Sequence, residues 1–188
     1  MEKSAGAQLG PKEWIDAAYA AFERGGVSAV KVEPLAKELS VTRGSFYWHF
    51  KDRKALLLEV VRRWDAKETE AAISANENGG GDARSRLERL LQTCGKDDGR
   101  LEIGMRSWAA GDADAREAIA RIDQKRIEYM VDLLEEAGGA QSEAQRRARV
   151  GYIAWLGAYT DAAPSSVEQR LDDMNCLSEL MLAGIGRT

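Results

Sequence analysis

Apolar residues recur at intervals of three and four along most of this 188-residue chain, which is the spacing of one face of an α-helix. The first run starts after Pro11 and stops at the glycine pair Gly25-Gly26. Its apolar members are Trp14, Ile15, Ala18, Tyr19 and Phe22. Because proline suits the first turn of a helix and glycine commonly ends one, the pattern predicts a first helix between these residues. Residues 1–10 lack this period and predict a mobile N-terminal arm.

Residues 32–50 predict two short helices joined by a tight turn. Pro34 suits a first helical position, so we expect the first of the two to run from there to about Ser40. Thr42 can accept a hydrogen bond from the backbone of the next turn.

The second short helix is expected from about Arg43 to His49. A helix of this length is not stable alone in water, so tertiary packing has to hold it. Phe46 and Phe50 lie four positions apart on one face and are its expected anchors.

Later runs predict a series of longer helices. Asp52 is the expected N-cap of one that continues to about Ala75, and a glycine-rich loop at residues 76–82 follows it. Further helices are expected over residues 82–94, 100–110, 113–137, 142–163 and 165–183. Because β-branched residues are sparse and alanine, leucine, glutamate and arginine abound, the predicted fold class is all-α.

The net charge of −4 first argues against a nucleic-acid partner. However, residues 1–54 hold nine Lys/Arg against seven Asp/Glu, a net +2, which leaves −6 for the rest. The basic end therefore has the sign needed to approach phosphate.

The sequence offers little for catalysis, metal binding or a cofactor. Cys94 and Cys176 form no metal-spaced pair, and we interpret both as small core residues in a reducing cytoplasm. His49 is the single histidine, and no nucleophile lies beside a base in a known pattern. Glu102, Arg106, Asp123 and Arg126 could form a polar cluster, but helix-surface pairing explains them at least as well. No enzyme, cofactor or metal site is predicted.

No apolar run reaches the length of a membrane-spanning helix, and the first residues lack a signal-peptide pattern. We therefore expect a cytoplasmic protein with no membrane partner.

The polar face of the second short helix carries the candidate chemistry. Arg43, Gly44 and Ser45 occupy its first turn, from which side chains of a helix in a major groove reach base edges. Gly44 is unusual, because glycine costs about 1 kcal/mol in a helix interior. Close approach of its backbone to DNA or to the preceding helix would explain it.

The segment from Ala17 to Leu57 resembles the DNA-binding domain of the TetR family of bacterial transcriptional regulators. The matching pieces, in order, are Gly25-Gly26, Leu35-Ala36, Gly44-Ser45-Phe46-Tyr47, His49-Phe50, and Arg53 before Leu56. Lys31 departs from the family pattern, which has Ser or Thr there as a cap.

The resemblance implies an N-terminal three-helix helix-turn-helix domain at residues 11–53 and a C-terminal helical bundle for ligand binding and dimerisation at residues 54–188. It implies a homodimer formed by the last two helices, about 142–183, which binds a palindromic site in double-stranded DNA. The candidate DNA-contacting residues are Lys31, Thr42, Arg43, Gly44, Ser45, Tyr47, Trp48, His49 and Arg53.

The expected function is transcriptional repression that a small-molecule effector relieves. Large apolar and aromatic side chains of the middle and late helices are the candidate effector contacts, with ordinary core packing as the alternative. These residues are Trp64, Met105, Trp108, Tyr152 and Trp155. A second hypothesis is a DNA-binding regulator that has no small-molecule effector and is controlled by a partner protein.

Overall fold

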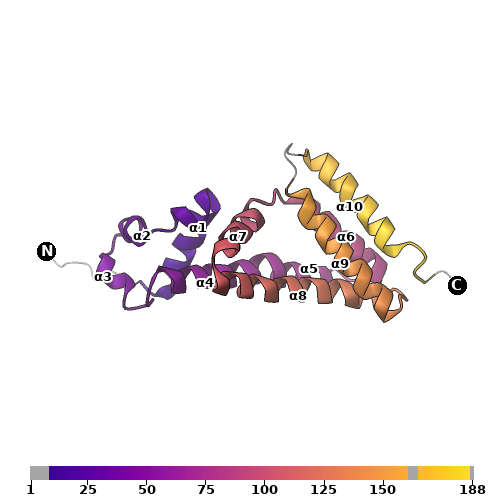
Figure 1. Ribbon diagram of the computed structural model, residues 1–188, viewed down its shortest axis with the longest axis horizontal. Helices are drawn as coiled ribbons and strands as arrows, with labels where there is room; N and C mark the ends of the chain where they lie inside the picture. Colours follow the sequence, from indigo (N-terminus) through magenta and orange to yellow (C-terminus); the bar gives the residue numbers. More distant parts are fainter. Residues whose placement is uncertain (1–8, 161–164, 187–188) are drawn as a thin grey trace. The chain divides into compact units, whose positions relative to one another are not determined.

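The computed structural model describes residues 9–160 and 165–186, and within these ranges it is helical with no strand (Figure 1). This confirms the predicted all-α fold. The elements are α1 (Pro11–Ala29), α2 (Val32–Glu38), α3 (Arg43–Phe46), α4 (Arg53–Trp64), the π-helix η1 (Asp65–Glu70), α5 (Ala71–Asn78), α6 (Ala83–Lys96), α7 (Arg100–Gly111), α8 (Ala113–Glu136), α9 (Gln141–Ala158) and α10 (Val167–Leu182). Residues 1–8 of the arm predicted at residues 1–10 lie outside the described residues, as does Pro164 between the last two predicted helices.

The chain forms two compact units. The first contains the chain up to Trp64 together with Gly104–Ala118, and the second contains Asp65–Ile103 and the chain from Ile119 onward. Helices α7 and α8 therefore each contribute residues to both units. The functional division expected after residue 53 stays a prediction.

The core of the first unit gathers the apolar faces of α1 to α4. Its fully buried side chains include Trp14, Val30, Leu35, Phe46, Leu56, Val60 and Trp64. Helix α1 begins at Pro11 as predicted, and its helical geometry breaks at Gly25 and Gly26, where Gly26 takes a φ of 62°. The break redirects the chain towards α2, as the glycine pair indicated.

The two short helices differ from the prediction at their ends. Helix α2 starts at Val32 and contains Pro34 as its third residue, so the predicted start at Pro34 was two residues late. Proline is tolerated throughout the first turn because the backbone N–H groups there have no helical partner. Helix α3 is a single turn, and residues 47–49 continue as turns rather than helix.

The core of the second unit is formed by α6, α8, α9 and α10. Its buried residues include Leu87, Leu91, Leu133, Leu134, Ala148, Tyr152, Met174 and Met181. Gly95 lies inside α6 and does not end it, because a Cβ there would stand 3.1 Å from Met174 Cγ and 3.2 Å from the Arg170 carbonyl of α10. Close packing of two helices is therefore the reason for this glycine.

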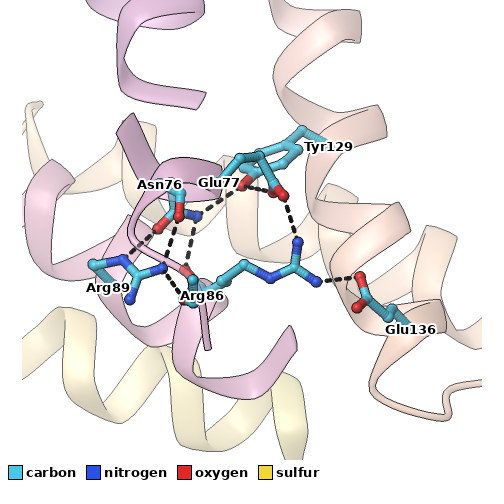
Figure 2. A network of polar contacts seen from close by, with 7 residues as sticks. Asn76, Glu77, Arg86, Arg89, Tyr129 and Glu136 are labelled. Carbon is cyan, nitrogen blue, oxygen red and sulfur yellow. Dashed lines mark hydrogen bonds and ion pairs between the residues drawn. The ribbon is translucent and has the colours of Figure 1, made fainter. Parts of the chain in front are cut away.

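Asn76, predicted to lie in a loop, belongs to α5 and is buried (Figure 2). Its Nδ2 donates to the Arg86 carbonyl at 3.0 Å and to the Tyr129 hydroxyl at 2.8 Å. Its Oδ1 accepts from Arg89 Nε at 2.9 Å. Tyr129 in turn donates to Glu77 at 2.5 Å. The network fastens α5, α6 and α8 together around the loop that contains Gly80 and Gly81.

Gly99 shows a backbone position that only glycine fits. Its φ is +71°, and a Cβ would overlap the ring of Tyr159. We expect Gly99→Ala to lower the free energy of unfolding by roughly 2–5 kcal/mol, the combined cost of a left-handed residue and of overpacking. Urea unfolding would measure the loss.

Gly80→Ala is the matched control, because Gly80 has a φ of +62° with nothing within 4 Å of the added Cβ. It should lose only about 1–2 kcal/mol. Equal losses for the two variants would contradict the role given to Tyr159.

Candidate nucleic-acid interface

A buried aromatic ring, that of Phe46, packs helix α3 against the rest of the first unit. Phe46 is fully buried, with its ring centroid 5.3 Å from that of Trp14 and 5.4 Å from that of Phe50. At its start, the Ser45 N–H donates to Thr42 Oγ1 at 3.4 Å, which is the capping contact expected from the sequence. Packing and capping together fix a helix that is too short to form alone.

The opposite side of α3 faces away from the protein. Thr42, Arg43 and Gly44 are exposed and Ser45 is half-buried. We call Arg43, Gly44 and Ser45 the α3 edge. A Cβ on Gly44 would meet only Thr42 Oγ1, at the ordinary distance of 3.6 Å. Close approach of the preceding helix therefore does not explain this glycine.

Two large aromatic side chains flank the α3 edge. Tyr47 is 54% exposed and Trp48 is 87% exposed. The Arg43 guanidinium donates to the Tyr47 hydroxyl at 3.4 Å, a bond that raises the pKa of Arg43 above its ordinary value. His49 is turned inward, and its Nε2 lies 3.0 Å from the Leu9 carbonyl, so this nitrogen carries the hydrogen.

The basic residues near α3 differ in their hydrogen-bond and ion-pair partners. The Arg53 guanidinium donates to the carbonyls of Val27 and Val30 and so ties the C-terminal end of α1 to the start of α4. Lys54 pairs with Asp114 at 2.6 Å and Asp112 at 3.1 Å, and both bonds raise its pKa. Lys31 is exposed at the N-cap of α2 and makes no side-chain capping bond.

The predicted effector residues fall into both compact units. Trp64 and Met105 are buried in the first unit and Trp108 is half-buried there. Tyr152 and Trp155 belong to the second unit, where their ring centroids are 5.3 Å apart.

Charged side chains surround Trp155 in the second unit. The Arg126 guanidinium lies over the Trp155 ring, 5.4 Å from its centroid. Arg126 Nη1 donates to Glu102 Oε2 at 2.9 Å, and Arg126 Nε donates to Thr69 Oγ1 at 2.9 Å. Both Arg126 and Glu102 are largely buried, with side-chain exposures of 11% and 7%. For Glu102 and Arg126, helix-surface pairing was therefore wrong, and the alternative of a polar cluster fits.

Two tyrosines and an aspartate complete this group of side chains, which we call the Trp155 cluster. Its members are Thr69, Glu102, Asp123, Arg126, Tyr152, Trp155 and Tyr159. The Tyr152 hydroxyl donates to Asp123 at 2.6 Å, and Trp155 Nε1 donates to the Tyr159 hydroxyl at 3.0 Å. Burial raises the pKa of both tyrosines, so they stay neutral.

The cysteines differ in their surroundings. The Tyr159 hydroxyl reaches the Cys94 carbonyl at 3.3 Å, and burial raises the pKa of the Cys94 thiol to about 12. Cys176 is exposed on α10, so its interpretation as a core residue was wrong.

Comparison with known proteins gives a family match for the N-terminal part of the chain. Residues 15–60 match the model of the bacterial regulatory proteins of the tetR family. The chain is also 35% identical over 77 residues to the HTH-type transcriptional regulator AcrR of Shigella flexneri, a match that spans 41% of this chain and 36% of that protein. Residues 15–60 of this chain therefore match the TetR family.

Solved structures share the fold of this chain over nearly its whole length. A transcriptional regulator from Rhodococcus sp. Rha1 superposes with a TM-score of 0.80 at 19% identity, covering 94% of this chain and 97% of that one. A transcriptional regulator from Saccharomonospora viridis, solved in complex with choline, gives a TM-score of 0.78 at 17% identity, covering 90% and 95% of the two chains. The named relatives are transcriptional regulators rather than enzymes.

Residues 9–160 and 165–186 contain neither a candidate metal site nor a candidate membrane span. No group of three or more His, Cys, Asp or Glu side chains there could hold a metal ion. In the same ranges no helix combines the length and the apolar character that crossing a bilayer requires.

The buried ion pair between Arg126 and Glu102 gives a stability prediction. Arg126→Met would leave Glu102 as a buried charge that has lost its ion pair with Arg126, and we expect a loss of about 3–5 kcal/mol in the free energy of unfolding. The double variant Arg126→Met/Glu102→Leu removes both charges and should recover most of that loss. Chemical denaturation of both proteins would measure this, and a single variant within about 1 kcal/mol of wild type would contradict the pairing.

Proposed function

We propose that this chain is a homodimeric DNA-binding transcriptional repressor, which a small-molecule effector releases from its operator. The observation that supports this most is the α3 edge, which exposes Arg43 and Gly44 while Phe46 is buried behind it. Arginine forms bidentate bonds with guanine, and a glycine beside it lets the helix backbone come close to a groove. The close neighbour that would explain Gly44 is then DNA, because no close contact within the described part of the protein requires a glycine at this position.

The flanking side chains would set the position of α3 on DNA. Tyr47, Trp48 and Lys31 are exposed and can contact the sugar–phosphate backbone, which contributes affinity without sequence preference. Thr42 and Ser45 lie at the start of the same turn. His49 and Arg53 act mainly through the protein, because both bond backbone carbonyls that hold the domain together.

Dimerisation would use the outer faces of α9 and α10. Val150 is 65% exposed and Ile153 is 58% exposed, and Ala154 and Gly157 continue the same stripe of α9. Val167 and Leu180 are exposed apolar residues of α10. An apolar stripe of this kind is stable in water when a second copy covers it, and a two-fold dimer presents two α3 helices to successive major grooves about 34 Å apart.

The effector site would be the Trp155 cluster. Aromatic rings, a hydroxyl group and buried charges converge there from η1, α7, α8 and α9, which is the composition of a small-molecule site. A structural relative binds choline, a small organic cation, and in this chain Trp155 already packs against the cationic group of Arg126. Operator binding that no compound alters would favour control by a partner protein instead.

Arg43→Ala tests the DNA-reading role. We expect the variant to lose preference at one base step, a change of about 5–150-fold in relative affinity that corresponds to the 1–3 kcal/mol of one bidentate contact. The DNA for this test is an operator selected from genomic fragments by the purified protein. Fluorescence anisotropy with single-base variants of this selected operator would measure the change in preference. Arg24→Ala is the control, since Arg24 is an exposed arginine of α1 that pairs with Glu38 at 3.3 Å. Identical base preferences for wild type and Arg43→Ala would reject this role.

Ile153→Glu tests the dimer. A buried glutamate without a partner is costly at an apolar interface, so sedimentation should show a monomer under conditions in which wild type is a dimer. Gln145→Glu adds the same charge to α9 at an exposed position off the stripe and should leave the dimer intact. A dimeric Ile153→Glu protein would exclude this face.

A further inference from the structure

The π-helix η1 occupies Asp65–Glu70, directly after α4 ends at Trp64. It is also the point in the chain at which the first compact unit gives way to the second. A π turn bonds residues five positions apart and carries one more residue per turn than the α-helices before and after it. The phase of every later residue of the helix depends on whether that turn is π or α.

The π conformation brings two carboxylates to one cation. Lys125 Nζ of α8 binds Asp65 Oδ2 at 2.6 Å and Glu70 Oε1 at 2.8 Å. These carboxylates are five positions apart, so the π turn aligns them along one side. In an α-helix the same two positions would point about 140° apart, and one lysine could not hold both.

The neighbouring residue of α8 fixes the same turn. Arg126 Nε donates to the hydroxyl of Thr69, which is buried in η1, at 2.9 Å. Two consecutive side chains of α8 therefore bind three side chains of η1. We call this arrangement the Lys125–Arg126 clasp.

With the Lys125–Arg126 clasp formed, one buried polar atom of η1 lacks a hydrogen bond within the described part of the chain. Asp65 Oδ1 is buried, and no donor from the described residues reaches it. The residues of η1 are Asp, Ala, Lys, Glu, Thr and Glu, a sequence that an ordinary α-helix accepts. The residues of η1 therefore give no local reason for a π turn, whereas its contacts with α8 do.

We propose that η1 is a register switch, π-helical while the Lys125–Arg126 clasp holds it and α-helical when the clasp opens. This rests on the proposed function, because the switch regulates DNA binding. Conversion to α-helix changes the phase of α5 relative to α4, and α4 belongs to the unit that contains α3. A ligand that displaces Arg126 from Thr69 would remove one of the three contacts of the clasp.

Lys125→Met is the first test. We expect the carbon chemical shifts of residues 65–70 to change from those of a π turn to those of an α-helix, and affinity for the selected operator to change about tenfold. Gln124→Met is the matched control, because Gln124 is the neighbouring residue of α8 and bonds Glu128 at 2.8 Å. It should leave both measurements at their wild-type values.

Deletion of Ala66 is the second test. Ala66 is exposed, and its loss removes the extra residue of the π turn, so the segment becomes α-helical while α4 and α5 keep their wild-type phase. Asp65 and Glu70 then stand four positions apart and still face Lys125. We expect wild-type operator affinity for the deletion protein and no further change when Lys125→Met is added.

Three outcomes would overturn the switch. These are π-type chemical shifts in Lys125→Met, operator affinity unchanged by Lys125→Met, or an equal effect of Lys125→Met with and without Ala66. If the deletion protein fails to fold, the chemical shifts and operator affinity of Lys125→Met alone decide. A wild-type protein that binds no selected DNA would instead reject the proposed function, and the chemical shifts would still test the π-to-α conversion.

Discussion

The α3 edge, the proposed DNA-reading surface, depends on the burial of one aromatic ring. Helix α3 has four residues, and a helix that short has no stability of its own. Phe46 supplies the stability by packing between Trp14 of α1 and Phe50, so the first unit's core is the support of the α3 edge. The same arrangement explains why Arg43 and Gly44 can be left in solvent, since they carry none of the packing.

Two groups of polar contacts in the second unit, the Asn76 network and the Lys125–Arg126 clasp, differ in their effect on the structure. The Asn76 network joins α5, α6 and α8 through short bonds, and such a network makes one geometry rigid (Figure 2). The Lys125–Arg126 clasp holds a less common helix type and leaves Asp65 Oδ1 buried without a donor from the described residues. Rigid anchoring beyond η1 and a convertible turn within it are the combination that a switch requires.

Much of this fold follows from the sequence, because helical period and end signals are local. The pattern located α1, the Thr42 cap, the Phe46 and Phe50 anchors and most of the later helices. It failed where distant partners decide. Residues 65–70 are ordinary helix formers, and their π-helical form, with its bonds to Lys125 and Arg126, has no local signal. Likewise, the sequence left Glu102 and Arg126 open between helix-surface pairing and a polar cluster and placed Asn76 in a loop, whereas tertiary packing buries all three.

Selection of genomic DNA fragments by the purified protein tests the central claim most directly. Two copies of the α3 edge related by a two-fold axis should enrich a palindrome whose half-site centres lie about 10 base pairs apart, or a multiple of that spacing. Enrichment of such a palindrome is the predicted result. Recovery of fragments with no common motif, or with a single unrepeated motif, would contradict the account.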